Sequence, residues 1–429
     1  MRLGGVVVFV LSGHCLSLSA QEVEDQVSEI VSELTEERIE QVMEDLLADI
    51  ESRISEDSLR IQTDHWLVMA EADVFAELEE EGYLFETVSE LDGLGFLLAE
   101  VAAPASFDLS ATREGIYDVI GGKRADIDLN HLYTAGVPNE IDGQSGLVGM
   151  APRELLSTPT DLSDLNLRIG IIDSSVDRTH STFAGASITT KRFVENNAPP
   201  NLHGTAIVSI IVGSDPMALG LAPKAEIFAA EVFDENEDQG EFASTVSLIK
   251  ALNWLVTSGV SVINISLAGP PNRLLETALN RVRQKGILAV AAAGNGGPMA
   301  QPMYPAAYPA VVAVTATDDR GRAFRLANRG EYVDIAAPGV NIRHARAGGG
   351  FIASSGTSYA VPFVTVAAAR LMQSTSEPTA MLDRLYTSAL DIDLVCPGGK
   401  GGTGLIHPFK LDNGLIQFPC TILRFPSGC

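Results

Sequence analysis

The sequence contains few cysteines, and they are widely spaced. Four occur in 429 residues, at Cys15, Cys396, Cys420 and Cys429, and no two form a CxxC pair. Structural zinc sites use closely spaced ligands, so this spacing argues against a metal centre of that kind. If Cys15 leaves with a signal peptide, the other three allow one disulfide in an oxidising compartment, with three alternative pairings.

Basic residues are also scarce, since 29 Lys and Arg stand against 56 Asp and Glu, a formal net charge of −27. A strongly acidic chain repels nucleic acid and anionic lipid surfaces, so we expect no nucleic-acid partner. We interpret the acidity as an aid to solubility or salt tolerance. Long apolar runs are absent too, which predicts no membrane span in the mature protein. The lack of a GxSxG stretch argues against an α/β-hydrolase.

The first 20 residues, "MRLGGVVVFVLSGHCLSLSA", have the layout of a secretory signal peptide. A basic residue, Arg2, precedes a short apolar run and then small residues up to Ala20. This layout predicts export, to the periplasm or the medium. The alternative is retention at the membrane through a lipid on Cys15, but in "LSGHC" His14 stands where a small residue is wanted.

The rest of the chain divides by composition into five parts. Residues 21–62 are acidic, with apolar residues three and four apart, which predicts an amphipathic helical extension. Residues 63–134 predict a small α+β module of βαβ type, with strands at "HWLVMAEA" and "GFLLAEVAAP" and a helix at "DVFAELEEEGY". Residues 135–160 are rich in turn formers and predict an exposed linker. Residues 161–407 form the largest part, and residues 408–429 a tail without clear pattern.

Apolar strand-like runs alternate with amphipathic helix-like runs from residue 165 to about 407. The strand-like runs are "LRIGIID", "AEIFAAEVF", "SVINISL", "ILAVAAAGN", "VVAVTAT" and "VDIAAPG". The fold class predicted is therefore α/β, a doubly wound, mostly parallel sheet with helices on both faces.

Binding and catalytic residues of such a sheet usually lie at the carboxyl ends of its strands or at the starts of the following helices. Four polar residues occur at such positions. They are Asp173, His203, Asn295 and Ser358. Each has an ordinary structural interpretation. Asp173 could cap a turn, His203 could simply begin a helix, Asn295 could be a turn residue, and Ser358 could be an N-cap.

Together the four residue types complete one mechanism. A serine hydroxyl needs a base within reach, and histidine has a pKa near neutrality. The imidazole needs a carboxylate to fix its tautomer and to stabilise its charged form. The oxyanion formed on attack needs preorganised donors, such as a side-chain amide and a helix-start N–H.

Six stretches, in this order, resemble the subtilisin-like serine proteases, the subtilase family. They are "IIDSSVDRTH", "HGTAIVSIIVG", "VINISLAGP", "AVAAAGN", "VDIAAPG" and "SGTSYAVP", and they cover residues 165–406. The resemblance implies that Ser358 is the nucleophile, His203 the general base and acid, and Asp173 its orienting carboxylate. It implies an oxyanion hole made by Asn295 and the backbone of Ser358.

The resemblance also implies the substrate-binding residues. A peptide or protein substrate would add as a strand to an edge made by Ser266, Leu267, Ala268 and Gly269. Met303 stands at the floor of the pocket for the residue before the cleaved bond, where the family often has a small residue. We therefore expect a preference for small residues there. Ser175, Tyr359 and Ala268 depart from the family's usual residues without removing a catalytic group.

The module at 63–134 resembles the family's propeptide, a partner in cis that assists folding and blocks the site. Cleavage is then expected between Gly136 and Thr160. No cofactor is required. Structural calcium is common in the family, but no acidic loop here has a recognisable ligand spacing. The prediction is an exported, autoprocessed serine endopeptidase. The alternative is a catalytically silent homologue that binds peptides or serves as a scaffold.

Overall fold

The computed structural model describes residues 61–424 apart from several gaps. The gaps are 84, 86, 103–108, 122–123, 136–138, 141–148, 157–166, 196–198, 237–239, 374–377, 388–389 and 392–422. The predicted signal peptide and nearly all of the acidic extension lie outside the described residues, and so do most of the linker and the tail. The domain boundaries stay predictions.

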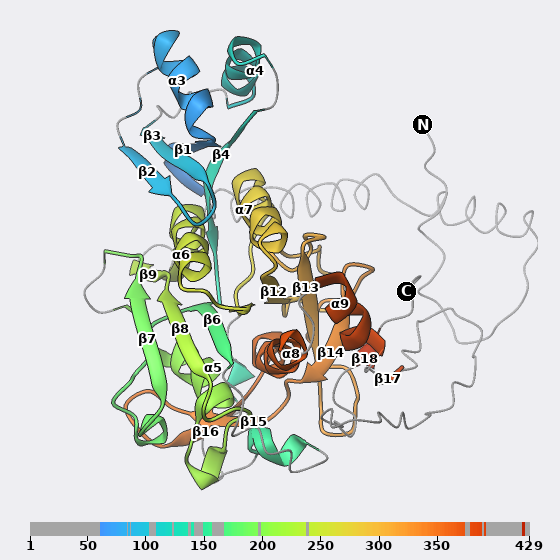
Figure 1. Cartoon of the computed structure of the whole chain (residues 1–429). Helices are drawn as coiled ribbons and strands as arrows, with labels where there is room; N and C mark the ends of the chain where they lie inside the picture. Colours follow the sequence, from blue (N-terminus) through green and yellow to red (C-terminus); the bar gives the residue numbers. More distant parts are fainter. Residues whose placement is uncertain are drawn as a thin grey trace, which may run out of the picture. The chain divides into compact units, whose positions relative to one another are not determined.

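The N-terminal module is an antiparallel sheet with two helices on one face (Figure 1). Its elements in chain order are β1 (Ile61–Ala70), α3 (Ala72–Glu80), β2 (Thr87–Leu91), β3 (Phe96–Ala102), α4 (Leu109–Val119) and β4 (Ala125–Tyr133). The strand order is β2-β3-β1-β4. The predicted strands and helix are present, but the simple βαβ interpretation was wrong. The short turn after β2 returns the chain as a hairpin, so β3 lies between β1 and β2.

The larger part contains the predicted parallel sheet, in the order β14-β13-β12-β11-β6-β8-β7. The strands are β6 (Arg168–Asp173), β7 (Ser187–Arg192), β8 (Glu226–Glu231), β11 (Val262–Ile265), β12 (Leu288–Ala292), β13 (Val311–Thr317) and β14 (Ile335–Pro338). Six of these are the six apolar runs of the sequence. The seventh, β7, is a polar strand at the edge of the described sheet, and it has no apolar pattern because none of its residues is fully buried.

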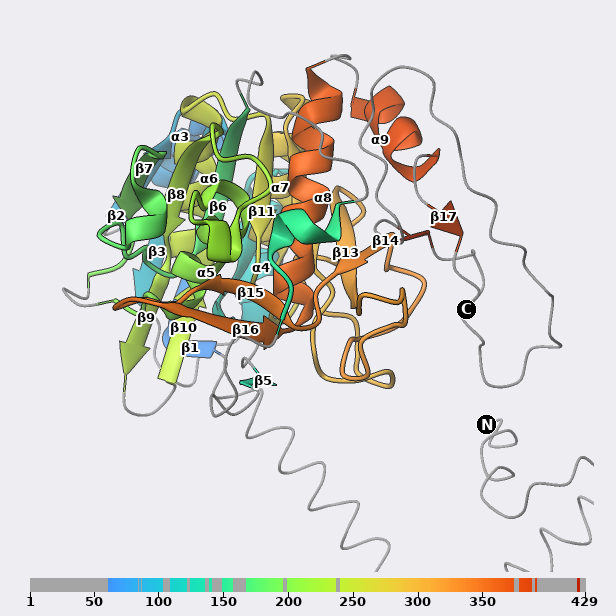
Figure 2. The same cartoon turned by 90° about the horizontal axis from the view of Figure 1, so that it is seen from below.

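Helices cover both faces of the parallel sheet, as Figure 2 shows. On one face lie α5 (Leu202–Val212) and α8 (Thr357–Met372), and on the other α6 (Thr245–Thr257) and α7 (Arg273–Gln284). Every residue of α5 after Leu202 is buried, which suits a helix that is apolar all round. The fold class predicted from the sequence is confirmed.

The module is joined to the larger part through a shared sheet. Strand β4 pairs with β10 (Gly240–Ser244), which pairs with β9 (Phe233–Asn236). One apolar cluster contains Leu67 and Leu98 of the module together with Leu252 of α6 and Leu275 of α7. The module therefore lies on α6 and α7, with its last strand directed toward the parallel sheet (Figure 1).

A small antiparallel sheet, β15-β16-β5, leads into α8. Its strands are β15 (Ile342–Ala345), β16 (Phe351–Ser355) and β5 (Asn139–Glu140). The remaining elements are η1 (Pro152–Leu155), η2 (Ser181–Phe183), η3 (Pro216–Ala218), α9 (Pro378–Thr387), β17 (Leu390–Asp391) and β18 (Leu423–Arg424). Within the described part of the chain, no helix combines the length and apolarity needed to cross a membrane.

Candidate active site

Asp173 and His203 meet at the carboxyl end of β6. Asp173 is the last residue of that buried strand, and His203 lies in the first turn of α5. His203 Nδ1 is 2.8 Å from Asp173 Oδ1 and 3.0 Å from Oδ2, and both side chains are buried. Because a carboxylate only accepts, Nδ1 carries the proton, and the neutral imidazole has its lone pair on Nε2. This is the state of a base.

Gly204 explains why α5 can approach β6 so closely. Its N–H donates to Ser174 Oγ at 2.8 Å. A Cβ at Gly204 would lie 2.2 Å from the Ser174 carbonyl oxygen, closer than any real contact allows. A glycine directly after His203 thus permits the contact that places the imidazole on Asp173.

The charge around His203 favours its protonated form. Burial lowers the pKa of His203, but the charge of Asp173, its hydrogen bond and the charge of Glu241 outweigh burial, so the pKa lies above its ordinary value. Burial also raises the pKa of Glu241, with further contributions from Glu235 and Asp173. Nothing in the sequence pattern had indicated Glu241, which lies on β10.

Ser358 lies in the first turn of α8 and is not its N-cap, which is Gly356. Its hydroxyl donates to the carbonyl oxygen of Ser266 at 3.3 Å. His203 Nε2 is buried and has no hydrogen-bond partner among the described residues. The hydroxyl must therefore turn from Ser266 to reach the base, as is common before substrate binds.

Pro362 has a role in this arrangement. A proline cannot donate the N–H that would normally bond the carbonyl four residues earlier, here that of Ser358. That carbonyl instead accepts from Ser266 Oγ at 3.3 Å. The same two serines are thus linked in both directions, which holds the start of α8 beside the residues after β11.

Asn295 lies beside the start of α8. Its Oδ1 accepts from the backbone N–H and the hydroxyl of Thr357, both at 3.0 Å. These bonds orient the amide so that Nδ2 lies on the side of Gly356, where an added Cβ would be 3.2 Å from it. The amide and the first-turn N–H of Ser358 offer two donors near one hydroxyl.

The predicted peptide-binding edge is occupied by the end of the module. Thr134 N–H donates to Ala268 O at 3.0 Å, and Ala268 N–H donates to Thr134 O at 2.9 Å. Beside it, Tyr133 is fully buried and its ring lies on Gly269, where an added Cβ would be 2.4 Å from Cδ1. The side chain of Leu267 is buried, so this residue offers only its backbone. No sequence signal had pointed to Tyr133.

Met303 lies near the loop that carries Asn295. It is half-buried, and an added Cβ at Gly294 would lie 3.1 Å from Met303 Cγ. The structure therefore brings Met303 to the neighbourhood of the other predicted site residues.

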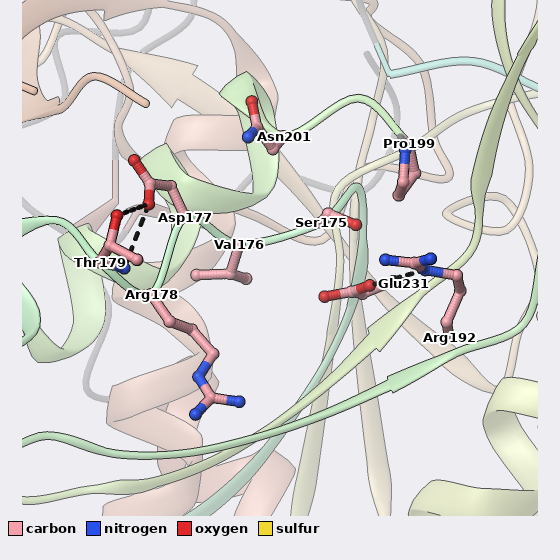
Figure 3. Close-up of a pocket in the computed structure, with 9 residues that line it drawn as sticks. All are labelled: Ser175, Val176, Asp177, Arg178, Thr179, Arg192, Pro199, Asn201 and Glu231. Atoms are coloured by element: carbon pink, nitrogen blue, oxygen red, sulfur yellow. Dashed lines mark hydrogen bonds and ion pairs between the residues drawn. The ribbon is translucent and has the colours of Figure 1, made fainter. Parts of the chain in front are cut away.

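A hollow of about 610 Å³ lies between the segment that follows β6 and the last residues of β7 and β8 (Figure 3). It is lined by Ser175, Val176, Asp177, Arg178, Thr179, Arg192, Pro199, Asn201 and Glu231. In it Arg192 Nε is 3.4 Å from Glu231 Oε2, whereas Asp177 turns away toward Thr179. No group of three or more His, Cys, Asp or Glu that could hold a metal occurs within the described ranges.

We compared the sequence with protein families and with proteins of known function. The profile of the Subtilase family matches residues 165–402. Subtilisin E of Bacillus subtilis (strain 168) is 32% identical over 251 residues, covering 55% of this chain and 64% of that protein, just under two thirds of its length. Subtilisin of Bacillus pumilus is 31% identical over 251 residues, covering 55% of this chain and 88% of that protein.

Among solved structures, the epidermin leader peptide processing serine protease of Staphylococcus aureus shares the fold. Its TM-score is 0.58 at 19% identity, and the match covers 78% of this chain and 94% of that one. The likeness of fold thus extends over more of the chain than the family profile does. On the profile match and the sequence relatives, this chain belongs to the subtilase family.

Proposed function

We propose that the chain is a serine endopeptidase that forms an acyl-enzyme on Ser358. Ser358 Oγ bonds to the carbonyl carbon of the peptide while His203 Nε2 takes the hydroxyl proton. The carbonyl electron pair moves to oxygen, where Asn295 Nδ2 and the Ser358 N–H donate to it. Collapse breaks the C–N bond, and His203 returns the proton to the leaving amine. Water repeats the sequence to release the acid.

One observation carries this proposal beyond family membership. The backbone pairing of Thr134 with Ala268 is the way an extended peptide would bind at this edge. The edge leads to Ser266, whose carbonyl is 3.3 Å from Ser358 Oγ. A peptide continuing in this direction reaches the nucleophile, with His203 and Asn295 beside it. A silent homologue would not require all four polar residues together with an edge that binds an extended peptide beside them.

The same contacts support a zymogen that cuts its own chain. On one side of Ser358 the module ends at the Thr134–Ala268 pairing, and on the other Asn139 and Glu140 pair with Ser355 and Ser354. Residues 136–138 lie outside the described residues, but the segments on both sides of them pair with residues close to Ser358, which supports a cleaved bond between Ala135 and Asn139. This narrows the range expected from the sequence, Gly136 to Thr160.

Gly136 lies outside the described residues, so we propose the bond by extending the register of the Thr134–Ala268 pair along the sequence. Two residues beyond Thr134 is Gly136, and two residues before Ala268 is Ser266, the residue in contact with Ser358 Oγ. We place the cleaved bond between Gly136 and Val137. Glycine there agrees with the small pocket expected from Met303, and profiling of peptide substrates that favoured Phe or Leu before the bond would contradict that pocket.

Export remains part of the proposal, since it rests on residues 1–20 alone. N-terminal sequencing of the exported protein separates release by signal peptidase from retention through Cys15.

The testing experiment is labelling with a fluorophosphonate, comparing the full chain with Ser358→Ala and reading the new N-terminus by mass spectrometry. We expect label on the wild type alone and a new chain beginning at Val137. Label on an uncut chain would keep the enzyme and end the zymogen proposal. A folded, processed chain without label would favour the silent homologue.

A further inference from the structure

Tyr359, the residue after the proposed nucleophile, is in ring contact with the imidazole of His203. Its ring centroid is 5.7 Å from that of His203, at an interplanar angle of 52°. The same ring stacks on His344 of β15, with centroids 5.2 Å apart and planes 8° apart. Three rings from α5, α8 and β15 are thus in continuous contact. All three residues are buried.

His344 is fixed by a hydrogen bond at each ring nitrogen. Nδ1 is 2.9 Å from the carbonyl oxygen of Ala345, and Nε2 is 2.9 Å from Ser354 Oγ. A carbonyl only accepts, so Nδ1 carries the proton, and the neutral Nε2 accepts from the serine hydroxyl. The neutral ring therefore has both of its hydrogen bonds satisfied and cannot rotate without losing them.

The surroundings of His344 keep it uncharged. Burial lowers its pKa to about 4, and the charge of His203 contributes in the same direction. The other charged groups that act on His203 are Asp173 and Glu241. A positive charge on His344 would oppose the imidazolium that forms on His203 during the reaction.

We propose that His344 and Tyr359 are positioning residues that hold the His203 ring in the plane of its bond to Asp173. Asp173 bonds the His203 ring at Nδ1 only. This hydrogen bond alone would leave the ring free to tilt about the line from Nδ1 to the carboxylate. Tyr359 restrains the tilt, and the uncharged ring of His344, stacked on Tyr359, supports it from behind. This inference rests on the proposed protease activity, which the fluorophosphonate label tests separately.

The experiment compares His344→Ala with His344→Phe in the full chain, after processing, with active sites counted by fluorophosphonate. His344→Ala removes the support, and we expect kcat per labelled site to fall about tenfold with KM little changed, as a small misplacement of the base would cause. The acid limb of kcat/KM should move to lower pH, because a looser ring bonds Asp173 less well. His344→Phe keeps the stacked ring and should recover kcat to within about twofold.

His180→Ala is the matched control. His180 is also buried and bonded, through Nε2 to Gly350 O at 2.9 Å, and it contacts Phe351, but it has no ring contact with Tyr359 or His203. It should lower stability without changing kcat per labelled site or the acid limb. If His344→Ala behaves like His180→Ala, or if folded His344→Phe is as slow as His344→Ala, the positioning role is wrong. An unlabelled wild type would instead count against the activity itself.

Discussion

In the proposed mechanism, the charge of Glu241 helps to set the pH at which His203 can act as a base. It lies on β10 directly across from Glu235, and its charge is among those that raise the pKa of His203. The base acts only when neutral, so activity rises as pH passes upward through that raised pKa. Anything that removes the charge of Glu241 should let the base work at lower pH.

We predict that Glu241→Gln shifts the acid limb of kcat/KM to lower pH and leaves the limiting rate nearly unchanged. The measurement is a pH profile of the processed enzyme at low ionic strength, because salt screens a partly exposed charge. Glu235→Gln is the control, since Glu235 is not among the groups that shift the pKa of His203. Equal shifts in the two variants would mean that general charge, and not the place of Glu241, is responsible.

The four polar residues that the sequence predicted lie at or near strand ends and helix starts, and the two residues that it did not predict lie elsewhere. Asp173 ends a strand, Asn295 follows one closely, and His203 and Ser358 lie at helix starts, so their place in the fold follows from local patterns. Tyr133 and Glu241 lie on β4 and β10, two strands that pair with each other although they are far apart in the sequence. Such pairing joins segments more than 100 residues apart, and no local periodicity records it.

At the scale of elements, the approach of α5 to β6 depends on a single missing side chain. A Cβ on Gly204 would lie 2.2 Å from Ser174 O and 2.7 Å from Ser175 O. Both are backbone atoms, which cannot swing aside as a side chain can. The helix would have to move away from the strand, and it would carry His203 with it.

We predict that Gly204→Ala slows fluorophosphonate labelling of Ser358 by about a hundredfold, because the base moves from its place on Asp173. Gly115→Ala in α4 is the control. The nearest atom to its added Cβ is Tyr83 Oη at 4.0 Å, so there is room for it. That variant should label normally and be slightly more stable, as alanine favours helix. Normal labelling of Gly204→Ala would show that α5 tolerates a shift.

The sequence predicted the strands that have strong apolar patterns. It did not predict the polar edge strand or the order of the strands within the sheet of the module. The six buried parallel strands follow from apolar runs between amphipathic helices. The edge strand β7 has only partly buried and exposed residues, so it resembles a loop in sequence. The hairpin that places β3 between β1 and β2 depends on the short turn after Leu91, which apolar periodicity does not describe.

At the scale of the whole molecule, Tyr133 anchors the module at the site. Its ring is fully buried against Gly269, at the end of the strand that pairs with β10. Truncating a buried aromatic ring costs about 3–5 kcal/mol, equivalent to a factor of ~100 or more in affinity. The module also contacts the larger part elsewhere, for example through the ion pair between Lys250 Nζ and Glu100 Oε1 at 2.9 Å. The uncut Tyr133→Ala chain should therefore keep the module in place.

We predict that Tyr133→Ala shortens the delay between cleavage of the chain and the appearance of activity on added peptide. The two are followed in one time course, by gel and by a fluorogenic substrate. Val119→Ala, at a position 39% exposed on α4, should leave the delay unchanged. An unchanged delay in Tyr133→Ala would mean that release is governed by the contacts on α6 and α7 instead.

Because the module pairs with the larger part through β4 and β10, the proposed activation has two steps, cleavage of the chain and release of the module. The two steps should depend differently on protein concentration. While the chain is intact, the bond and the nucleophile belong to one molecule, so the first cut should proceed at a rate independent of protein concentration. After the cut, the covalent link no longer holds the module at a high effective concentration, and its rebinding becomes bimolecular. Dilution should therefore leave processing unchanged and hasten activity, so that for a zymogen that is exported as proposed, dilution in the medium would itself complete the activation.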